Sequence, residues 1–562
     1  MVRGNCASRY HSIVKSKSIR NIHAASGLAM RRRPALTLML ALTVAVLPVQ
    51  SGQAQAQFRP AAPAAAFNLP TLGDTERDDL APGMERKLGE EIMRDIRRNV
   101  DYLDDDPILE YLNDFGNTLV EARPGARGET SFDYAFFAVR DTQLNAFALP
   151  GGFIGVHSAL LLAAQTESEL ASVLSHEIGH VAQRHIARML GQQRQDALIP
   201  LAAIVLAALA SRAGGDAAIG VFAAGQGLAM QRQLNFSRDA EREADRIGFQ
   251  IMDDAGFETT GMVAFFGRMQ TASRTYSDLT PAYLLSHPLT TERIADIQAR
   301  IRAMPYRQRV DSLDFHLVRA RTRVLQDPSG QGLLDAGAVF KTQLLQPNRR
   351  EIAAAQYGLA FIALKKNDVA KAQIWLDSAR ATVHPAPDAS VFGMAGAAPP
   401  NAMLASMALD ITLAAGAASA STQAAKEAVQ QAQAAHLQFP RSRGIARQVA
   451  EAMIALRQTG DVADDAAGDP ARYLRDQIQL YREEYKLHDL LAKTYAAEGK
   501  IALQHMALAE SYALRGALMA ALEQLTLARK SSDASFYDMS VIDARERQLQ
   551  TRRREEIKEG KK

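Results

Sequence analysis

The sequence predicts a mainly helical protein with one small β-sheet, and three observations support this fold class. Apolar residues recur at helical spacing through most of the chain, three short β-type runs lie between residues 132 and 157, and alanine-rich helical pairs recur in the C-terminal part. The 562 residues exceed one ordinary domain, so two or three are expected. A composition of 47% hydrophobic and 23% charged residues is typical of a globular chain, not a disordered or membrane-filled one.

The N-terminus has the layout of a secretory signal peptide. From Met30 the chain reads "MRRRPALTLMLALTVAVLPVQSGQAQAQ", with three arginines, an apolar stretch at 34–49 and a small-residue "AQA" at 54–56. We therefore predict that residues 1–56 are a signal peptide cleaved after Ala56, and we interpret Met30 as the true start.

Removal of this segment changes the charge balance. It holds eight Lys or Arg and no Asp or Glu, so 65 basic residues become 57 against 62 acidic ones, a balance of −5. The apparent basicity belongs to the signal, and no nucleic-acid partner is inferred. Cys6 is the one cysteine and is removed too, so the mature chain has no thiolate for a metal. An exported chain with no other retention signal is expected in the periplasm.

A flexible segment and a helical pair are expected after the signal. Residues 57–84 are rich in Ala, Pro and polar residues and are predicted to be flexible. Residues 85–122 have apolar positions at helical spacing in two segments, which are separated by "DDDP" at 104–107. Three aspartates before a proline favour a capped helix start over a calcium site.

Three strands and a long helix are predicted next. The β-type runs are "FDYAFFAV" at 132–139, "NAFAL" at 145–149 and "FIGVH" at 153–157, and "PGG" at 150–152 forms the turn between the last two. Residues 166–193 predict one long amphipathic helix.

An apolar helical hairpin is predicted over residues 197–230. Its first half, "ALIPLAAIVLAALA", has 14 residues, whereas a bilayer span needs about 20. The hairpin is therefore either buried in the protein or available for peripheral contact with a membrane surface or an apolar client. Residues 236–305 return to amphipathic helices.

Residues 310–562 are helical and alanine-rich, and two segments within them match each other. "LAFIALKKNDVAKAQIWLDSA" from Leu359 and "LAESYALRGALMAALEQLTLA" from Leu508 align at the small and large positions of a tetratricopeptide helix pair. A weaker copy lies around Ala428, and a half-copy begins at Leu491. Stacked pairs of this kind form an α-solenoid whose concave surface binds peptides or proteins.

The motif "SHEIGH", residues 175–180, places two histidines around a glutamate. Helix residues four apart differ by about 40° around the axis, so His176 and His180 project side by side and can hold one metal ion. Glu177 lies at the edge of that face, where it can act as a general base on a water molecule, the arrangement of an H-E-x-x-H site. Gly179 allows close backbone approach.

A catalytic zinc needs a third protein ligand, and "SRDAEREADRIGF" at 237–249 offers candidates. Glu241 and Asp245 share a helix face, whereas Glu243 is turned away from Glu241 by about 160°. This spacing lets Glu241 bind the metal while Asp245 orients a ligand histidine through its second ring nitrogen. A solvated charged helix face is the alternative.

Two further histidines are not assigned as ligands. His185 is nine residues from His176, so on one continuous helix it points to the opposite side, and we expect a structural or outer contact. His157 ends a predicted strand and has no partner at ligand spacing.

Together these motifs resemble the M48 family of zinc metallopeptidases, a gluzincin-type (zincin) group. HEIGH is followed 61 residues later by the glutamate of "EREAD", and "NAFALPGG" at 145–152 is similar to the family's stretch before the active-site helix. "SHPLTTERI" at 286–294 resembles its downstream His-Pro…Arg element. The resemblance implies a metallopeptidase domain over residues 85–305, followed by tetratricopeptide repeats, with one zinc ion per chain.

The resemblance also implies a role for each matched residue. The zinc ligands would be His176, His180 and Glu241. Glu177 would be the general base, and Asp245 would contact a ligand histidine and orient it. Zinc lowers the pKa of a bound water toward about 7, which brings proton removal within reach of a carboxylate.

Further contacts would serve the substrate. Arg293 and His287 would face the oxyanion of the tetrahedral intermediate. An extended substrate could pair by main-chain hydrogen bonds with one predicted strand. The strand residues are Asn145, Ala146, Phe147 and Ala148. The expected substrates are unfolded or misassembled exported proteins, and the resemblance implies outer-membrane assembly machinery as a partner of the repeat region.

Other interpretations remain open. His287 could instead occupy the fourth zinc position, displace the water and inhibit the enzyme. The chain could be mainly a non-proteolytic chaperone or scaffold that binds clients through its repeats, although the presence of Glu177 favours an enzyme. An integral-membrane peptidase is disfavoured, because no apolar run of 18 residues follows the signal.

Overall fold

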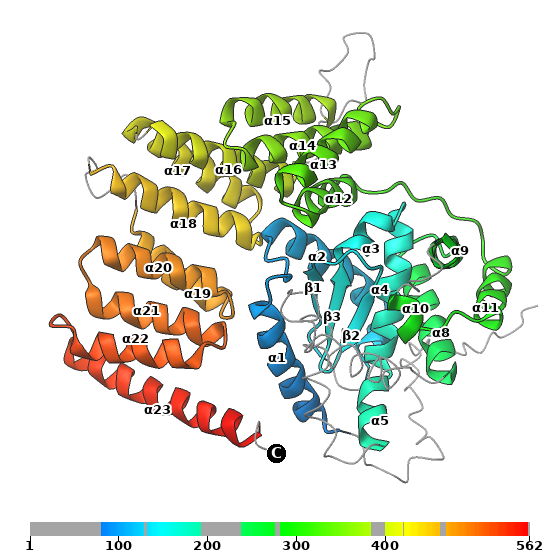
Figure 1. Ribbon diagram of the computed structural model, residues 1–562, viewed down its shortest axis with the longest axis horizontal. Helices are drawn as coiled ribbons and strands as arrows, with labels where there is room; N and C mark the ends of the chain where they lie inside the picture. The colour runs from blue at the N-terminus through cyan, green and yellow to red at the C-terminus, as the bar shows by residue number, and fades with distance from the viewer. Residues whose placement is uncertain are drawn as a thin grey trace, which may run out of the picture. The chain divides into compact units, whose positions relative to one another are not determined.

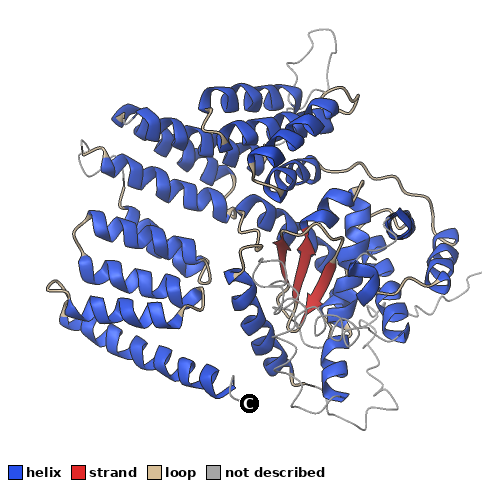
Figure 2. Ribbon diagram, in the orientation of Figure 1, coloured by secondary structure: helices blue, strands red, loops and turns tan. Residues whose placement is uncertain are grey.

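A computed structural model describes residues 80–128, 132–192, 238–275, 282–383, 400–419, 421–460 and 468–559. Within these ranges the chain is mainly helical with one small β-sheet, which confirms the predicted fold class (Figure 2). The predicted signal peptide and the hairpin 197–230 lie outside the described residues.

All three predicted strands are present and form one sheet in the order β1-β3-β2. Their bounds are β1 (Ala135–Val139), β2 (Ala146–Leu149) and β3 (Phe153–His157). β1 pairs with β3 in parallel, and β2 pairs with β3 antiparallel. The β2–β3 turn contains Gly151 and Gly152, whose φ angles of 77° and 92° favour glycine. Within the described sheet β2 is therefore an edge strand.

Helices α1 to α11 accompany this sheet (Figure 1). They are α1 (Pro82–Arg98), α2 (Asp106–Ala122), the 3₁₀ helix η1 (Pro124–Arg127), α3 (Ser158–Ala163), α4 (Glu167–Ala182), α5 (His185–Gln192), α8 (Arg238–Asp254), α9 (Thr260–Thr275), α10 (Ala282–Ser286) and α11 (Thr291–Arg302). The predicted flexible segment ends earlier than expected, because α1 already begins at Pro82. Helix α4 carries "SHEIGH", is buried along its whole length and packs against α8, α9 and β2.

The predicted single helix over residues 166–193 is wrong, because the chain breaks at Arg184 between α4 and α5. Arg184 has φ 53°, a conformation uncommon for residues other than glycine. Its Nε lies 3.2 Å from Oε2 of the buried Glu85 on α1, which helps to hold this conformation. The break changes the direction of every side chain that follows it.

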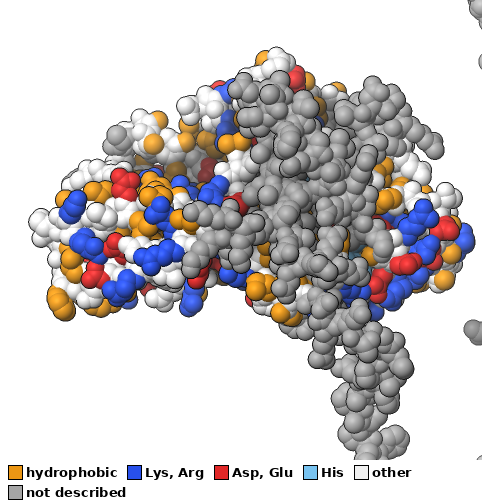
Figure 3. Space-filling view, turned by 60° about the horizontal axis from the view of Figure 1, so that its bottom comes forward, with side chains coloured by type: hydrophobic (Ala, Val, Ile, Leu, Met, Phe, Trp, Pro, Cys, Tyr) orange, Lys and Arg blue, Asp and Glu red, His pale blue; other side chains and the backbone are white. Residues whose placement is uncertain are grey.

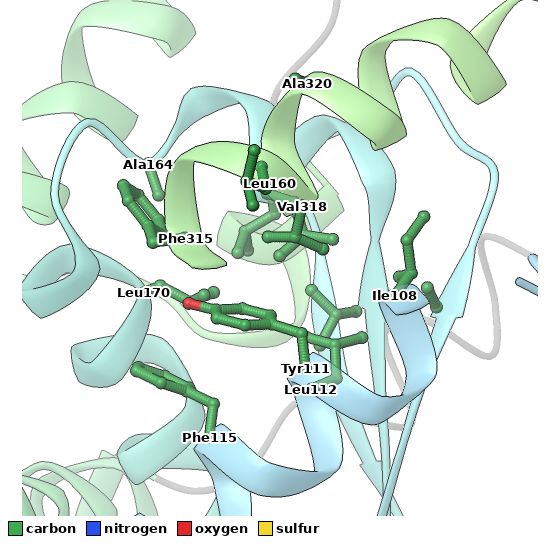
Figure 4. Packing of buried hydrophobic residues seen from close by; sticks show 14 of the residues in the cluster. Ile108, Tyr111, Leu112, Phe115, Leu160, Ala164, Leu170, Phe315, Val318 and Ala320 are labelled. Carbon is green, nitrogen blue, oxygen red and sulfur yellow. The ribbon is translucent and has the colours of Figure 1, made fainter. Parts of the chain in front are cut away.

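One hydrophobic core joins the sheet, the helices around α4 and the first helix of the C-terminal region (Figure 4). Leu112 on α2, Leu160 on α3 and Leu170 on α4 pack together with Phe315 on α12. Burying a side chain of this size stabilises the fold by about 1.5–3 kcal/mol. Helix α12 therefore contributes to the core around the sheet and is also the first helix of the C-terminal region. The predicted domain boundary near residue 310 stays a prediction.

The C-terminal region consists of helices that pack on their sequence neighbours. They are α12 (Leu313–Gln326), α13 (Gly330–Gln343), α14 (Arg349–Lys365), α15 (Val369–Val383), α16 (Ala402–Ser419), α17 (Thr422–Gln438), α18 (Arg443–Gln458), α19 (Pro470–Leu480), α20 (Tyr485–Ala497), α21 (Ile501–Leu514), α22 (Leu518–Lys530) and α23 (Phe536–Glu559). In the two matching segments, the alanines Ala360, Ala372, Ala509 and Ala521 are fully buried. Small buried residues at these positions let paired helices approach closely, as expected for an α-solenoid.

One described helix, α16, has the length and apolar composition that would suffice to cross a membrane. It contains Asp410, whose Oδ1 accepts a hydrogen bond of 2.6 Å from Gln448 on α18, and it packs against α15, α17 and α18. These contacts are those of a core helix in the repeat region. On the face shown in Figure 3, acidic and basic side chains are interspersed over the described surface.

The "DDDP" turn caps α2, as predicted, with Asp105 as the N-cap. The three aspartates also contact cations from three different helices of the repeat region. The pairs are Asp104 with Lys486 at 2.7 Å, Asp105 with Arg321 at 2.6 Å and Asp106 with Arg447 at 2.9 Å. These ion pairs give the motif a structural role that its sequence does not reveal.

Candidate metal centre

The two histidines of "SHEIGH" lie one turn apart on the buried helix α4. Their Nε2 atoms are 3.0 Å apart, and both side chains are almost fully excluded from solvent. Two imidazole nitrogens at this distance either share a proton or direct their lone pairs at a common ion. His176 and His180 therefore form the pair of donors that the helical spacing predicts.

Helix α8 brings a carboxylate to the same point. Glu241 Oε1 lies 3.4 Å from His180 Nε2, and Glu241 Oε2 lies 3.5 Å from His176 Nε2. The approach of the two helices depends on glycine: a Cβ on Gly179 would lie 2.9 Å from the carbonyl oxygen of Ala244. On the other helix, a Cβ on Gly248 would lie 2.9 Å from the backbone nitrogen of His176.

Asp245 lies behind His176, one turn further along α8. Its Oδ1 is 2.9 Å from His176 Nδ1, so Nδ1 can donate a proton to it while Nε2 keeps its lone pair. Burial would raise the pKa of Asp245, but hydrogen bonds from Arg293 and His176 lower it to about 2. Asp245 is therefore a carboxylate near neutral pH.

Arg293, on α11, is buried behind the carboxylates. Its Nε and Nη2 donate to the two oxygens of Asp245 at 2.6 and 2.8 Å, and its Nη1 lies 2.7 Å from Glu241 Oε2. These contacts fit a residue that positions Asp245 and Glu241. Contact between Arg293 and an oxyanion, as the resemblance implies, would require the guanidinium to leave these acceptors, and that role stays a prediction.

His287, from the loop after α10, completes the group. Its Nδ1 lies 3.3 Å from His176 Nε2 and 3.0 Å from Glu241 Oε1. The ring is buried and packs against the ring of Tyr283, with centroids 4.7 Å apart. Tyr283 has no motif signal in the sequence beyond its place four residues before His287.

These donors fit one zinc ion. Four ligand atoms placed about 2.1 Å from a tetrahedral ion lie about 3.4 Å from one another. Five donor distances around this point, from 3.0 to 3.5 Å, are close to this value, with Glu241 Oε1 facing His180 and His287 and Glu241 Oε2 facing His176. His176, His180, Glu241 and His287 all place one candidate ligand atom within 4.8 Å of the others. Nitrogen and carboxylate donors without a thiolate are typical of catalytic zinc.

Glu177 lies beside this group and is fully buried. Burial raises the pKa of its carboxyl, although the cationic forms of His287 and His176 and the backbone amide of Ala148 act in the opposite direction. Its Oε1 is 3.5 Å from His287 Nε2. A buried carboxyl with a raised pKa next to a metal site can accept a proton and pass it on.

The predicted substrate strand also lies near Glu177. Residues Ala146–Leu149 form the edge strand β2, which packs against α4, and the amide of Ala148 faces the Glu177 carboxyl. Asn145 precedes the strand, and its backbone oxygen accepts from His157. An edge strand offers unpaired main-chain groups to an extended peptide. The substrate-binding role of residues 145–148 remains a prediction.

Two residues that we did not assign to the site lie next to it: His185 contacts the ligand His180, and Glu243 contacts His185. His185 Nδ1 lies 2.9 Å from His180 Nδ1, and His185 Nε2 lies 3.2 Å from Glu243 Oε2. The expected outer contact of His185 is present, but its direction was not predicted, because the helix breaks at Arg184. The pairing of Glu243 with His185 could not be read from α8 alone.

Comparisons with known proteins agree with this geometry. Residues 111–301 match the model of "Peptidase family M48". The chain is 31% identical over 497 residues to the "Beta-barrel assembly-enhancing protease" of Escherichia coli O157:H7, which covers 88% of this chain and 93% of that protein. It is 39% identical over 269 residues to a "Putative beta-barrel assembly-enhancing protease" of Vibrio cholerae, covering 47% of this chain and 54% of the relative. It is also 32% identical over 171 residues to the "Mitochondrial metalloendopeptidase OMA1" of Schizosaccharomyces pombe, covering 30% of this chain and 48% of that protein. The chain therefore belongs to peptidase family M48, a family of zinc metallopeptidases.

Proposed function

We propose that this zinc metalloendopeptidase cleaves unfolded or misassembled exported proteins, as part of the quality control of outer-membrane protein assembly. The observation that carries the enzymatic part is the convergence of His176, His180 and Glu241 beside the buried Glu177. A metal site with structural function alone would not need a buried carboxyl of raised pKa at its edge.

The roles of the side chains follow from their contacts. His176, His180 and Glu241 hold the zinc ion, which when bound polarises the scissile carbonyl and acidifies water. Glu177 accepts a proton from the attacking water and delivers it to the leaving amine. Asp245 holds the proton of His176 at Nδ1, so that Nε2 faces the metal.

The edge strand β2 provides a track for the substrate. Main-chain hydrogen bonds with residues 145–148 would bind an extended peptide without a strict sequence requirement. Because folded proteins seldom offer an extended segment, unfolded chains are the natural substrates.

His287 provides the regulatory part of the proposal. Its Nδ1 lies among the metal donors, where it would take the fourth position and exclude water. Replacement of His287 by alanine should then raise the basal rate of peptide cleavage. An unchanged basal rate in the His287→Ala variant would rule out inhibition by this residue.

The cellular context rests on the relatives. The Escherichia coli protein, whose name refers to β-barrel assembly, aligns with 88% of this chain, including most of the repeat region. We infer a periplasmic location and contact between the repeats and outer-membrane assembly machinery. Peripheral membrane contact through residues 197–230 is a further expectation.

The second candidate is a chaperone or scaffold that seldom cuts, and the presence of His287 among the metal donors favours it. Cleavage of an unfolded model protein by the purified chain should be compared with the Glu177→Gln variant at matched zinc content. Loss of cleavage in the variant, with zinc retained, would establish Glu177 as the base. If neither protein cuts although both hold zinc, the chaperone function is favoured.

A further inference from the structure

The Nδ1 atoms of the two ligand histidines contact different kinds of residue. His176 Nδ1 meets a carboxylate directly, at 2.9 Å from Asp245 Oδ1. His180 Nδ1 instead meets another histidine, at 2.9 Å from His185 Nδ1, and His185 Nε2 lies 3.2 Å from Glu243 Oε2. His180 and His185 are buried, and Glu243 is partly exposed.

One arrangement of protons satisfies all these contacts when His180 binds a metal. Nε2 of His180 faces the other donors and must be unprotonated, so its proton is at Nδ1. That proton is donated to Nδ1 of His185, which must therefore be unprotonated too. The remaining proton of neutral His185 is at Nε2, where Glu243 accepts it. The tautomer of each ring is thus fixed by the next residue in the chain of contacts.

The break at Arg184 makes these contacts possible. On a continuous helix, residues five apart differ by about 140° around the axis, and His185 would point away from His180. The positive φ of Arg184 turns α5 so that the two rings meet, with centroids 4.9 Å apart. A non-glycine residue in this region is strained, and the ion pair of Arg184 with buried Glu85 offsets that strain.

We propose that His185 and Glu243 are positioning residues for the metal ligand His180. His185 holds the proton of His180 at Nδ1, so that the lone pair on Nε2 is directed at the zinc. Glu243 fixes the tautomer of His185 and increases the basicity of both rings. This inference rests on the proposed zinc site, and it adds a support for His180 that matches the one Asp245 gives His176.

The test is the zinc affinity of the full chain, measured by competition with a chromophoric chelator. His185→Phe keeps an aromatic ring but removes the acceptor, and we expect zinc to bind about 10 to 100 times more weakly. Glu243→Ala should weaken binding in the same direction by a smaller factor. Asp239→Asn, an exposed carboxylate on the same helix, is the matched control and should bind zinc as the unaltered chain does.

A double variant separates positioning from general damage. Because Glu243 acts through His185, His185→Phe combined with Glu243→Ala should bind zinc no more weakly than His185→Phe alone. The proposal is overturned if Glu243→Ala stays within twofold of the control, or if the two losses simply add. Glu243→Ala removes a partly exposed side chain, so it remains informative even if His185→Phe fails to fold. Failure of the unaltered chain to bind zinc would instead refute the proposed function.

Discussion

Two acidic clusters within the described residues balance their charge in different ways. At the start of α2, Asp104, Asp105 and Asp106 each lie within 3 Å of a Lys or Arg from the repeat region. In the metal centre, Glu241 contacts one permanent cation, Arg293, but it also faces the nitrogens of His176 and His180, which already lie 3.0 Å from each other.

The pKa shifts reflect this difference. Burial would raise the pKa of Asp106, but Lys486 and Arg447 outweigh it and lower that pKa. Burial would likewise raise the pKa of Glu241, but the charge of His287 and hydrogen bonds from His176, His180 and His287 lower it well below its usual range. Permanent cations alone satisfy the first cluster, whereas the second combines one permanent cation, Arg293, with crowded imidazoles that need protons or a metal ion between them.

The two clusters differ in a way that distinguishes structural carboxylates from functional ones. A buried carboxylate that pairs with Arg or Lys is already neutralised by the fold, and its removal should affect stability. Glu241 contacts Arg293 as well, but its two oxygens also face imidazole nitrogens at donor distances for a shared metal ion, so its removal should affect binding and activity. Four substitutions test this distinction, starting with the largest expected effect.

Glu241→Ala should abolish zinc binding and lower peptidase activity by about 1,000-fold or more, because two histidines alone hold zinc poorly. Zinc content per chain and cleavage of an unfolded protein are the measurements. Asp239→Asn on the same helix should change neither. Stoichiometric zinc in the Glu241→Ala variant would show that the donors do not act as the structure indicates.

Asp106→Ala should produce the opposite pattern. It removes one of the two carboxylates that each of Lys486 and Arg447 contacts in a partly buried position, which costs about 2–3 kcal/mol in the free energy of unfolding. Zinc content and the rate per folded molecule should stay unchanged. Denaturant unfolding measures the loss, and Asp239→Asn again is the surface control. An unaltered unfolding midpoint would mean that these ion pairs are loose in solution.

Much of this architecture was predictable from short patterns. The strands, the DDDP cap and the face shared by His176 and His180 follow from local periodicity and capping. The pairing of each aspartate with a repeat helix was not predictable, because it depends on contacts between residues more than 200 positions apart. The role of His185 was missed for a local reason: the break at Arg184 has no glycine or proline to indicate it.

Glu110→Gln tests another carboxyl of α2 that contacts the repeat region. Its hydrogen bonds come from neutral groups and not from Lys or Arg. Glu110 accepts hydrogen bonds from Ser442 and the amide of Gly444, and burial raises its pKa to about 7. A raised pKa means that the folded state binds more protons, so this group's contribution to stability is present at low pH and is lost as the pH rises toward 7.

The expected size follows from the shift. The free energy of unfolding should fall by about 2 kcal/mol between pH 5 and pH 7 through Glu110, and this component should be absent in Glu110→Gln. Urea unfolding of both proteins across this range measures the difference. Parallel pH profiles would show that the carboxyl titrates normally in the folded protein.

The smallest expected effect concerns the contact between α4 and α8. A methyl group on Gly248 would lie 2.9 Å from the nitrogen of His176 and 3.0 Å from the carbonyl oxygen of Ser175, so Gly248→Ala should separate the helices slightly and cost about 1–2 kcal/mol. Because α8 carries Glu241 and Asp245, zinc affinity should fall together with stability. Gly267→Ala on α9 meets no atom within 4 Å and should instead stabilise the protein by about 0.5–1 kcal/mol. If both substitutions stabilise the protein equally, the close approach of the two helices is not what places the carboxylates against the histidines.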